Sequence, residues 1–372
     1  MHMRRLALAV PLLAGTWAAC SSDAASTPDD PVRDAGPDVA VPAPAVDAGL
    51  DCTKDLSADG VHRHLACTGL YASLADKTVT DGVRPYKPAE EFWSDGAQKQ
   101  RWLWLPPGTK IDTTNGDEWT FPAGTKAWKE FVLGGKRIET RHYVKLDDGT
   151  WKHTTYRWNA DESDATRKDI GEKIAGLGPD GGTYEVPASG ACDDCHRGRT
   201  DQLLGIEAVN IGLPGATGLT LDGLAASGLL TTAPARTTLA FPGDATARAA
   251  LGFLHTNCGG CHNGNPDAKA RTRAHFLVRP SELTGTEAVT DLELYRDAWC
   301  KDGHLTEDDG TTYKYIRGGA PERSIASVLS GFRVPEGEDP DDRQMPPVVT
   351  RAVDVAGHDA LDAWIRTLPP CP

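Results

Sequence analysis

Two copies of the pattern Cys-x-x-Cys-His constrain this 372-residue chain more than any other feature. One copy spans residues 192–196 and the other spans residues 258–262. Two thiols three positions apart on one turn can form thioethers to both vinyl groups of a single porphyrin, and the adjacent histidine then lies beneath the iron. The pattern therefore predicts two covalent c-type haems. Their thioether cysteines would be Cys192, Cys195, Cys258 and Cys261, and their proximal iron ligands His196 and His262.

A zinc site or plain disulfide bonds are the alternative explanations of these four cysteines. A four-cysteine zinc ribbon usually separates its two pairs by about 15–20 residues, whereas a far longer stretch lies between Cys195 and Cys258. A redox Cys-x-x-Cys pair has no need of a following histidine, yet both copies have one. The haem interpretation is therefore favoured over both.

The N-terminus is typical of an export signal. Arg4 and Arg5 precede a short apolar run, and Cys20 then follows a segment that resembles a bacterial lipoprotein cleavage site. Trp17 stands where that site usually has Leu or Val. We expect a lipoprotein-type signal peptide over residues 1–20, with lipidation at Cys20 and a periplasm-facing position on the outer membrane. Without lipidation, the product would be a soluble periplasmic protein.

The net charge restricts the classes of partner. The chain carries a formal charge of −14 and has a pI near 5.2, which argues against binding to nucleic acid or to anionic membrane surfaces. No internal apolar run approaches the roughly 20 residues of a membrane span. We therefore expect redox partner proteins of the cell envelope, and membrane contact only through a lipid at Cys20.

The remaining cysteines are even in number, which suits an oxidising compartment. They are Cys52, Cys67, Cys300 and Cys371. Four cysteines allow three pairings. The simplest is Cys52 with Cys67 and Cys300 with Cys371.

The first half of the chain predicts a linker followed by a β-rich domain. Residues 21–50 are rich in Ala, Pro and Asp and contain no aromatic residue, so we expect a disordered tether. Residues 51–186 hold seven of the ten tryptophans. Gly134-Gly135 indicates a hairpin between 128–133 and 136–146, and the second run alternates cleanly between apolar and polar residues. A third strand over 151–158 would complete a meander in a sandwich or barrel-like domain.

The second half predicts a haem-bearing segment over 187–238 and an all-α cytochrome c domain over 239–372. Asp244 is a plausible N-cap for a helix that runs into the second Cys-x-x-Cys-His pattern, and Pro321 precedes another helix. The final helix places Leu361, Trp364, Ile365 and Leu368 on one face. The expected fold class is α+β and multidomain.

The sixth iron ligands differ between the two haems. Met345 is the only methionine left once Met1 and Met3 leave with the signal peptide, and two prolines stiffen the loop that carries it. A thioether ligand favours ferrous iron. We expect Met345 on the second haem. The first haem has another ligand or an open position. His142, on the apolar face of its strand, is one candidate, although a buried neutral histidine is the commoner state.

An ordered set of motifs resembles an uncharacterised bacterial family of exported diheme c-type cytochromes. The motifs are Phe92-Trp93-Ser94-Asp95-Gly96-Ala97, Leu105-Pro106-Pro107-Gly108, Trp119-Thr120-Phe121-Pro122-Ala123-Gly124-Thr125, Ile138-Glu139-Thr140-Arg141, Tyr156-Arg157-Trp158, both Cys-x-x-Cys-His patterns, Pro321-Glu322-Arg323-Ser324 and Met345-Pro346-Pro347. They cover roughly residues 85–370. The resemblance implies two covalent haems and a redox role, with no substrate to carry over.

The leading functional interpretation is single-electron transfer through two covalent haems. One alternative is a diheme peroxidase-like enzyme with an open first haem, which would need a distal acid–base group. Another is a redox-linked sensor or binding protein in which the aromatic β-rich domain holds a ligand. Whether the protein is an enzyme stays open at this point.

Overall fold

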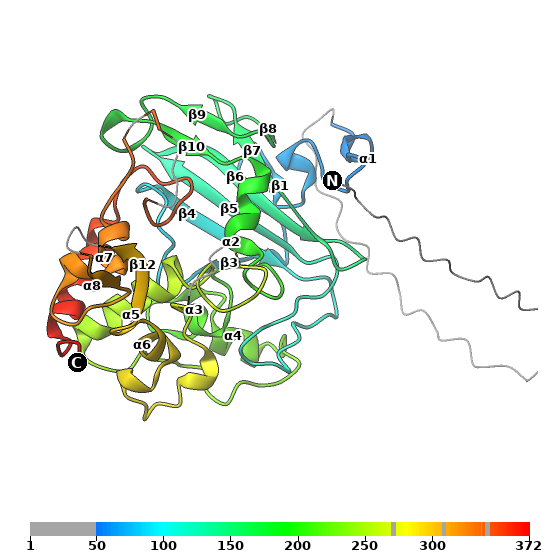
Figure 1. Ribbon diagram of the computed structural model, residues 1–372. Coiled ribbons are helices and arrows are strands. Elements are labelled where there is room, and N and C mark those ends of the chain that lie inside the picture. Colours follow the sequence, from blue (N-terminus) through cyan, green and yellow to red (C-terminus); the bar gives the residue numbers. More distant parts are fainter. Residues whose placement is uncertain (1–49, 269–272, 307–309, 336, 339–342) are drawn as a thin grey trace, which may run out of the picture. The chain divides into compact units, whose positions relative to one another are not determined.

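The largest element is an antiparallel sheet of seven strands. They are β3 (Arg84–Lys87), β4 (Gln98–Trp104), β5 (Lys126–Leu133), β6 (Lys136–Lys145), β7 (Trp151–Trp158), β8 (Ala165–Arg167) and β11 (Thr217–Gly218). Their order across the sheet is β11-β3-β4-β5-β6-β7-β8 (Figure 1). Strands β5, β6 and β7 form the expected meander, and the predicted hairpin at Gly134-Gly135 is confirmed.

The computed structural model describes residues 50–268, 273–306, 310–335, 337–338 and 343–372. The signal peptide over 1–20, the lipidation at Cys20 and the linker up to residue 49 lie outside these ranges. The described residues all belong to one compact unit.

Both faces of the sheet are buried. One face carries the cross-strand neighbours Trp102 and Trp128, together with Tyr156 and Trp158, and packs against Leu65 and other residues of the N-terminal segment. This segment contains α1 (Cys52–Asp55), β1 (Tyr71–Ser73) and β2 (Thr78–Val79). The opposite face contributes Leu103, Ala127 and Tyr143 to a larger core that is shared with the helices.

Within the described residues, seven helices contribute to this larger core, and the sequence predicts three of them: the helix after Asp244, the helix near Pro321 and the final helix. The seven helices are α2 (Ser189–His196), α3 (Ala208–Gly212), α4 (Leu221–Ala226), α5 (Ala245–Asn257), α6 (Glu293–Ala298), α7 (Ile325–Ser330) and α8 (Val355–Thr367). The Asp244 carboxylate accepts a hydrogen bond from the Ala247 N–H at 2.9 Å, which confirms the N-cap of α5. Helix α5 packs against α8, whose Leu361 and Trp364 are buried (Figure 1). No helix within the described residues is long and apolar enough to cross a membrane.

Two expectations about architecture need correction. The sheet is open, with β11 and β8 at its edges, so it is neither a barrel nor a sandwich of two comparable sheets. The C-terminal part is not all-α, because β12 (Asp302–Thr306) pairs with β13 (Thr312–Lys314). Exposure alternates residue by residue along β12, which is the period of a strand. The broader α+β class holds.

The remaining elements are short connections. A two-stranded sheet joins β9 (Glu172–Ile174) to β10 (Tyr184–Val186). Turns of 3₁₀ helix occur at Leu65–Cys67, Pro179–Gly181, Pro280–Glu282, Val289–Asp291 and Pro321–Arg323. The Pro321 turn leads directly into α7, so the helix expected there is present in two short pieces.

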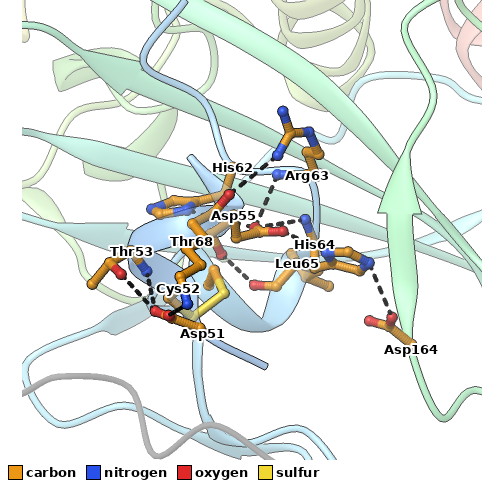
Figure 2. The surroundings of a disulfide bond; sticks show 12 residues. Asp51, Cys52, Thr53, Asp55, His62, Arg63, His64, Leu65, Thr68 and Asp164 are labelled. Atoms are coloured by element: carbon orange, nitrogen blue, oxygen red, sulfur yellow. Dashed lines mark hydrogen bonds and ion pairs between the residues drawn. A yellow bond between two sulfur atoms is a disulfide. The ribbon is translucent and has the colours of Figure 1, made fainter. Parts of the chain in front are cut away.

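The structure contains two disulfides, one near each end of the described chain. Cys52 bonds to Cys67 and Cys300 bonds to Cys371, which are the pairs expected from the sequence. Figure 2 shows that the first disulfide lies beside a buried carboxylate, Asp55, which accepts hydrogen bonds from the backbone N–H groups of Arg63 and His64 at 3.0 Å. The N-terminal segment is therefore held by a disulfide bond and by backbone hydrogen bonds to a buried carboxylate group.

The two disulfides should differ in how much they stabilise the protein. They close loops of 15 and 71 residues. Because a longer loop loses more entropy in the unfolded chain, the double variant C52A/C67A should lose roughly 3 kcal/mol of unfolding free energy and C300A/C371A about 4 kcal/mol. Urea denaturation of both variants measures this. A smaller loss for C300A/C371A than for C52A/C67A would contradict the loop-entropy argument.

Candidate functional site

The first Cys-x-x-Cys-His pattern forms helix α2, which lies against β7. Its histidine, His196, ends the helix, and Nδ1 lies 2.6 Å from the carbonyl oxygen of Gln202. A carbonyl oxygen only accepts, so Nδ1 carries the proton and Nε2 keeps its lone pair. Burial lowers the pKa of His196 to about 3, so the ring is neutral at pH 7. A neutral imidazole with a free Nε2 is the form that ligates a metal ion.

The second pattern follows helix α5, with Cys258 at the helix C-cap. The N–H of His262 donates to the Cys258 carbonyl at 2.9 Å, which closes the pattern into a tight turn. The His262 ring interacts with the carbonyl of Ala274, and burial lowers the pKa of His262 to about 4. Both histidines are thus neutral and held by a backbone carbonyl. Every residue has a backbone carbonyl, so the sequence could not indicate which carbonyl contacts each histidine.

The two patterns touch each other although they lie far apart in the chain. A Cβ atom at Gly198 would come within 2.1 Å of the Gly260 carbonyl oxygen, so only glycine fits there. The Cys261 sulfur lies 3.4 Å from the carbonyl oxygen of Asp194. A hydrogen bond with the Cys195 thiol raises the pKa of Cys261. One sulfur of each pattern therefore lies beside a sulfur of the other.

Asn263, the residue after the second pattern, links the two turns. It is buried, and its side-chain amide donates to the carbonyls of Gly198 at 2.9 Å, Gly259 at 2.9 Å and Gly260 at 3.0 Å. Its Oδ1 accepts from the N–H of Asn265 at 3.0 Å. Sequence reasoning missed this residue, because its partners come from two separate segments.

A cavity of about 710 Å³ opens between the sheet and the helices at this contact. Its walls include Cys195, His196, Cys258, Cys261, His262 and Met345. Cys192 is the exception, because it is buried beside the Tyr143 hydroxyl. Burial raises the pKa of the Cys192 thiol, and the hydrogen bond with Tyr143 offsets only part of that rise. Six of the seven residues predicted to hold haem thus line one cavity.

Met345 reaches this cavity from a loop that Gln344 holds in place. The Gln344 side chain is fully buried. Its amide donates to the carbonyls of Pro346 at 2.9 Å and Thr350 at 3.1 Å, and its Oε1 accepts from the Val334 N–H at 2.9 Å. The Met345 N–H donates to the Leu329 carbonyl at 2.8 Å. The loop is therefore braced against α7, so the thioether is presented from a fixed backbone.

His142 does not reach the cavity, so the structure removes it as a candidate ligand of the first haem. Successive side chains of a strand point to opposite faces, and its neighbours Arg141 and Tyr143 line the cavity. The His142 ring stacks on Trp128 with centroids 5.2 Å apart on the other face. Burial lowers the pKa of His142 well below its usual value. It is a buried neutral core residue.

The donor set of each pattern is two thiols and one neutral imidazole, which are the groups that a covalently bound haem uses. Burial raises the pKa of Cys258 to about 12, so its thiol is protonated at neutral pH. Within the described ranges, two groups of side chains lie close enough to share an ion: Asp55, His62 and Cys67, and His275, Glu293 and Asp297. Neither includes a cysteine of the two patterns, and Cys67 is in a disulfide.

Comparison with known proteins adds no identity: no family model, no curated protein and no solved structure matches the chain.

The bridging role of Asn263 can be tested by a nearly isosteric change. Asn263→Asp removes the two N–H donors and places a carboxylate against three carbonyl oxygens. We expect a loss of about 3 kcal/mol in unfolding free energy, the cost of unsatisfied buried polar groups. Urea denaturation at neutral pH measures it.

Asn115→Asp is the matched control for this measurement. Asn115 is exposed, and its side chain accepts from the Asp117 N–H through Oδ1. A carboxylate keeps that hydrogen bond, so the control should be as stable as the unmodified protein. Equal stability of the two variants would show that Asn263 does not hold the two turns together.

Proposed function

We propose that this protein is an exported diheme c-type cytochrome that transfers single electrons through two covalently attached haems. The observation that carries the proposal is the shared cavity: both Cys-x-x-Cys-His patterns meet there, and Met345 faces it from a braced loop. This is consistent with the family of exported diheme cytochromes that the sequence motifs resemble.

Each haem would be held by one pattern. Cys192 and Cys195 would form the thioethers of the first haem and Cys258 and Cys261 those of the second. The Gln202 carbonyl fixes the His196 ring so that Nε2 faces away from its hydrogen bond. The Ala274 carbonyl interacts with the His262 ring. Haem iron supplies reversible one-electron redox chemistry.

Met345 would be a ligand of the second haem iron together with His262, since both line the cavity. A thioether stabilises ferrous iron and raises the reduction potential. The second haem would then be the higher-potential site, with no position left for a substrate. Residues 239–372 would act as a cytochrome c domain, in which α5 and α8 pack together and the second pattern follows α5.

The contact between the two patterns supports electron exchange within the chain. The Cys195 and Cys261 thiols form a hydrogen bond with each other, so neighbouring sulfurs would hold the two haems. Haems held in this way would supply a route for single electrons within the chain. Outside partners would be redox proteins of the cell envelope that present a basic surface to the acidic chain, and a lipid at Cys20 would supply the membrane attachment.

Haem content is the direct test. Protein matured together with the c-type haem attachment machinery should have the mass of the exported chain plus two haems. The double variants C192S/C195S and C258S/C261S should each keep one. Intact-mass spectrometry and a pyridine haemochrome assay measure this. A colourless product with the mass of the polypeptide alone would refute the proposal. In that product the four cysteine thiols of the two patterns would be free or in disulfides.

Replacing Met345 should affect the second haem alone. Met345→Leu should abolish the weak long-wavelength absorption of ferric iron bound to a thioether and lower the reduction potential of one haem, because the sulfur that favours ferrous iron is lost. Absorption spectra and a redox titration measure both. Val348→Leu is the control, since Val348 lines the same cavity and cannot ligate iron. An unchanged spectrum in M345L would rule out Met345 as a ligand.

A further inference from the structure

Three cations lie directly opposite one another across three strands in the wall of the cavity. Arg101 on β4 pairs with Lys129 on β5, and Lys129 pairs with Arg141 on β6. All three line the cavity. Like charges in directly opposite positions of adjacent strands destabilise a sheet. A row of this kind beside a redox site therefore requires an explanation.

Only the two outer members of the row have carboxylate partners. Arg101 donates to Glu91 at 2.9 Å, and Arg141 donates to Glu139 at 2.7 Å. Within the described residues, the Lys129 side chain makes no hydrogen bond or ion pair. Its Nζ lies instead between two aromatic rings, 5.2 Å from the centroid of Phe92 and 5.1 Å from that of Phe131.

Burial, together with the charges of Arg101, Arg141 and Lys99, lowers the pKa of Lys129 well below its usual value. An amine that gives up its proton on binding a metal ion presents a lone pair on nitrogen. Such a nitrogen is a ligand of the same kind as imidazole.

Lys129 lies on the same part of the sheet as the residue that contacts the first histidine. Tyr143, on the adjacent strand and the same face of the sheet, stacks on the His196 ring with centroids 4.5 Å apart. The cavity-lining histidine outside the two patterns, His304, acts instead on His262. Lys129 is therefore the nitrogen donor that the sheet directs towards the first haem position.

We propose that Lys129 is the sixth ligand of the iron in the first haem, opposite His196. This inference rests on the proposed function and extends it, because it gives both haems a full set of protein ligands. The first iron would have two nitrogen ligands and the second would have nitrogen and sulfur. The first haem would then have no open position for a substrate.

The alternative role for Lys129 is a charge partner for a porphyrin carboxylate. Arg101 is better placed for that role, because its Nη2 is buried and lacks a hydrogen-bond partner among the described residues. The side chain of Arg101 is only 2% exposed. A buried guanidinium donor of this kind is suited to a carboxylate. The substitution Lys129→Arg keeps the positive charge and removes the amine, so it distinguishes an iron ligand from a charge partner.

The test uses the haem-loaded ferric protein at neutral pH. Electron paramagnetic resonance and near-infrared magnetic circular dichroism should show two low-spin haems in the unmodified protein, one with imidazole–thioether ligation and one with imidazole–amine ligation. In K129L and in K129R the first haem should become high-spin while the second is unchanged. K99L is the matched control: Lys99 lies on the same face of the sheet and donates to the Phe92 carbonyl at 2.6 Å.

Each contrary result has a distinct meaning. A low-spin first haem in K129R would show that the charge matters and the amine does not, which overturns the inference. A high-spin or bis-imidazole first haem in the unmodified protein overturns it without any variant. In both cases the mass of the protein would still include two haems. Absence of haem from the unmodified protein would instead refute the proposed function.

Discussion

The contact between the two Cys-x-x-Cys-His turns is the constraint on which the rest of the structure depends. Gly198 lies against the Gly260 carbonyl, and the Asn263 amide joins both turns. This contact brings together a helix that rests on the sheet and a turn at the end of α5. The side-by-side sulfurs and the meeting of both patterns at one cavity follow from it.

Much of the local structure could be predicted from periodicity. The alternation over residues 136–146 indicated β6, and the apolar stripe after Asp244 indicated α5, whose stripe residues Ala247, Ala250, Leu251 and Leu254 are all buried. Local patterns also identified six of the residues that line the cavity, because the spacing of Cys, His and Met reflects chemistry rather than topology. The chemical assignment of those residues as haem ligands stays a prediction.

The long-range arrangement could not be predicted, for physical reasons. Both faces of the sheet are buried, so the apolar side of β6 did not indicate which face meets the two turns. His142 lies on the face that is turned away from them. β11 pairs with β3 through only two residues. Two residues are too few to show the alternation of apolar and polar side chains by which a strand is recognised. The partners of Asn263 and Gln344 are mostly backbone carbonyl and N–H groups, which every sequence supplies, so only the fold selects them.

The close fit of the two turns has a consequence for how such a protein is made. Cys192 is buried under the sheet, and the glycine contact leaves no room for an enzyme to reach between the turns. In the proposed cytochrome, the attachment apparatus must therefore act on a chain whose turns are still apart. Folding would follow ligation, and the porphyrins would serve as the template around which sheet and helices close.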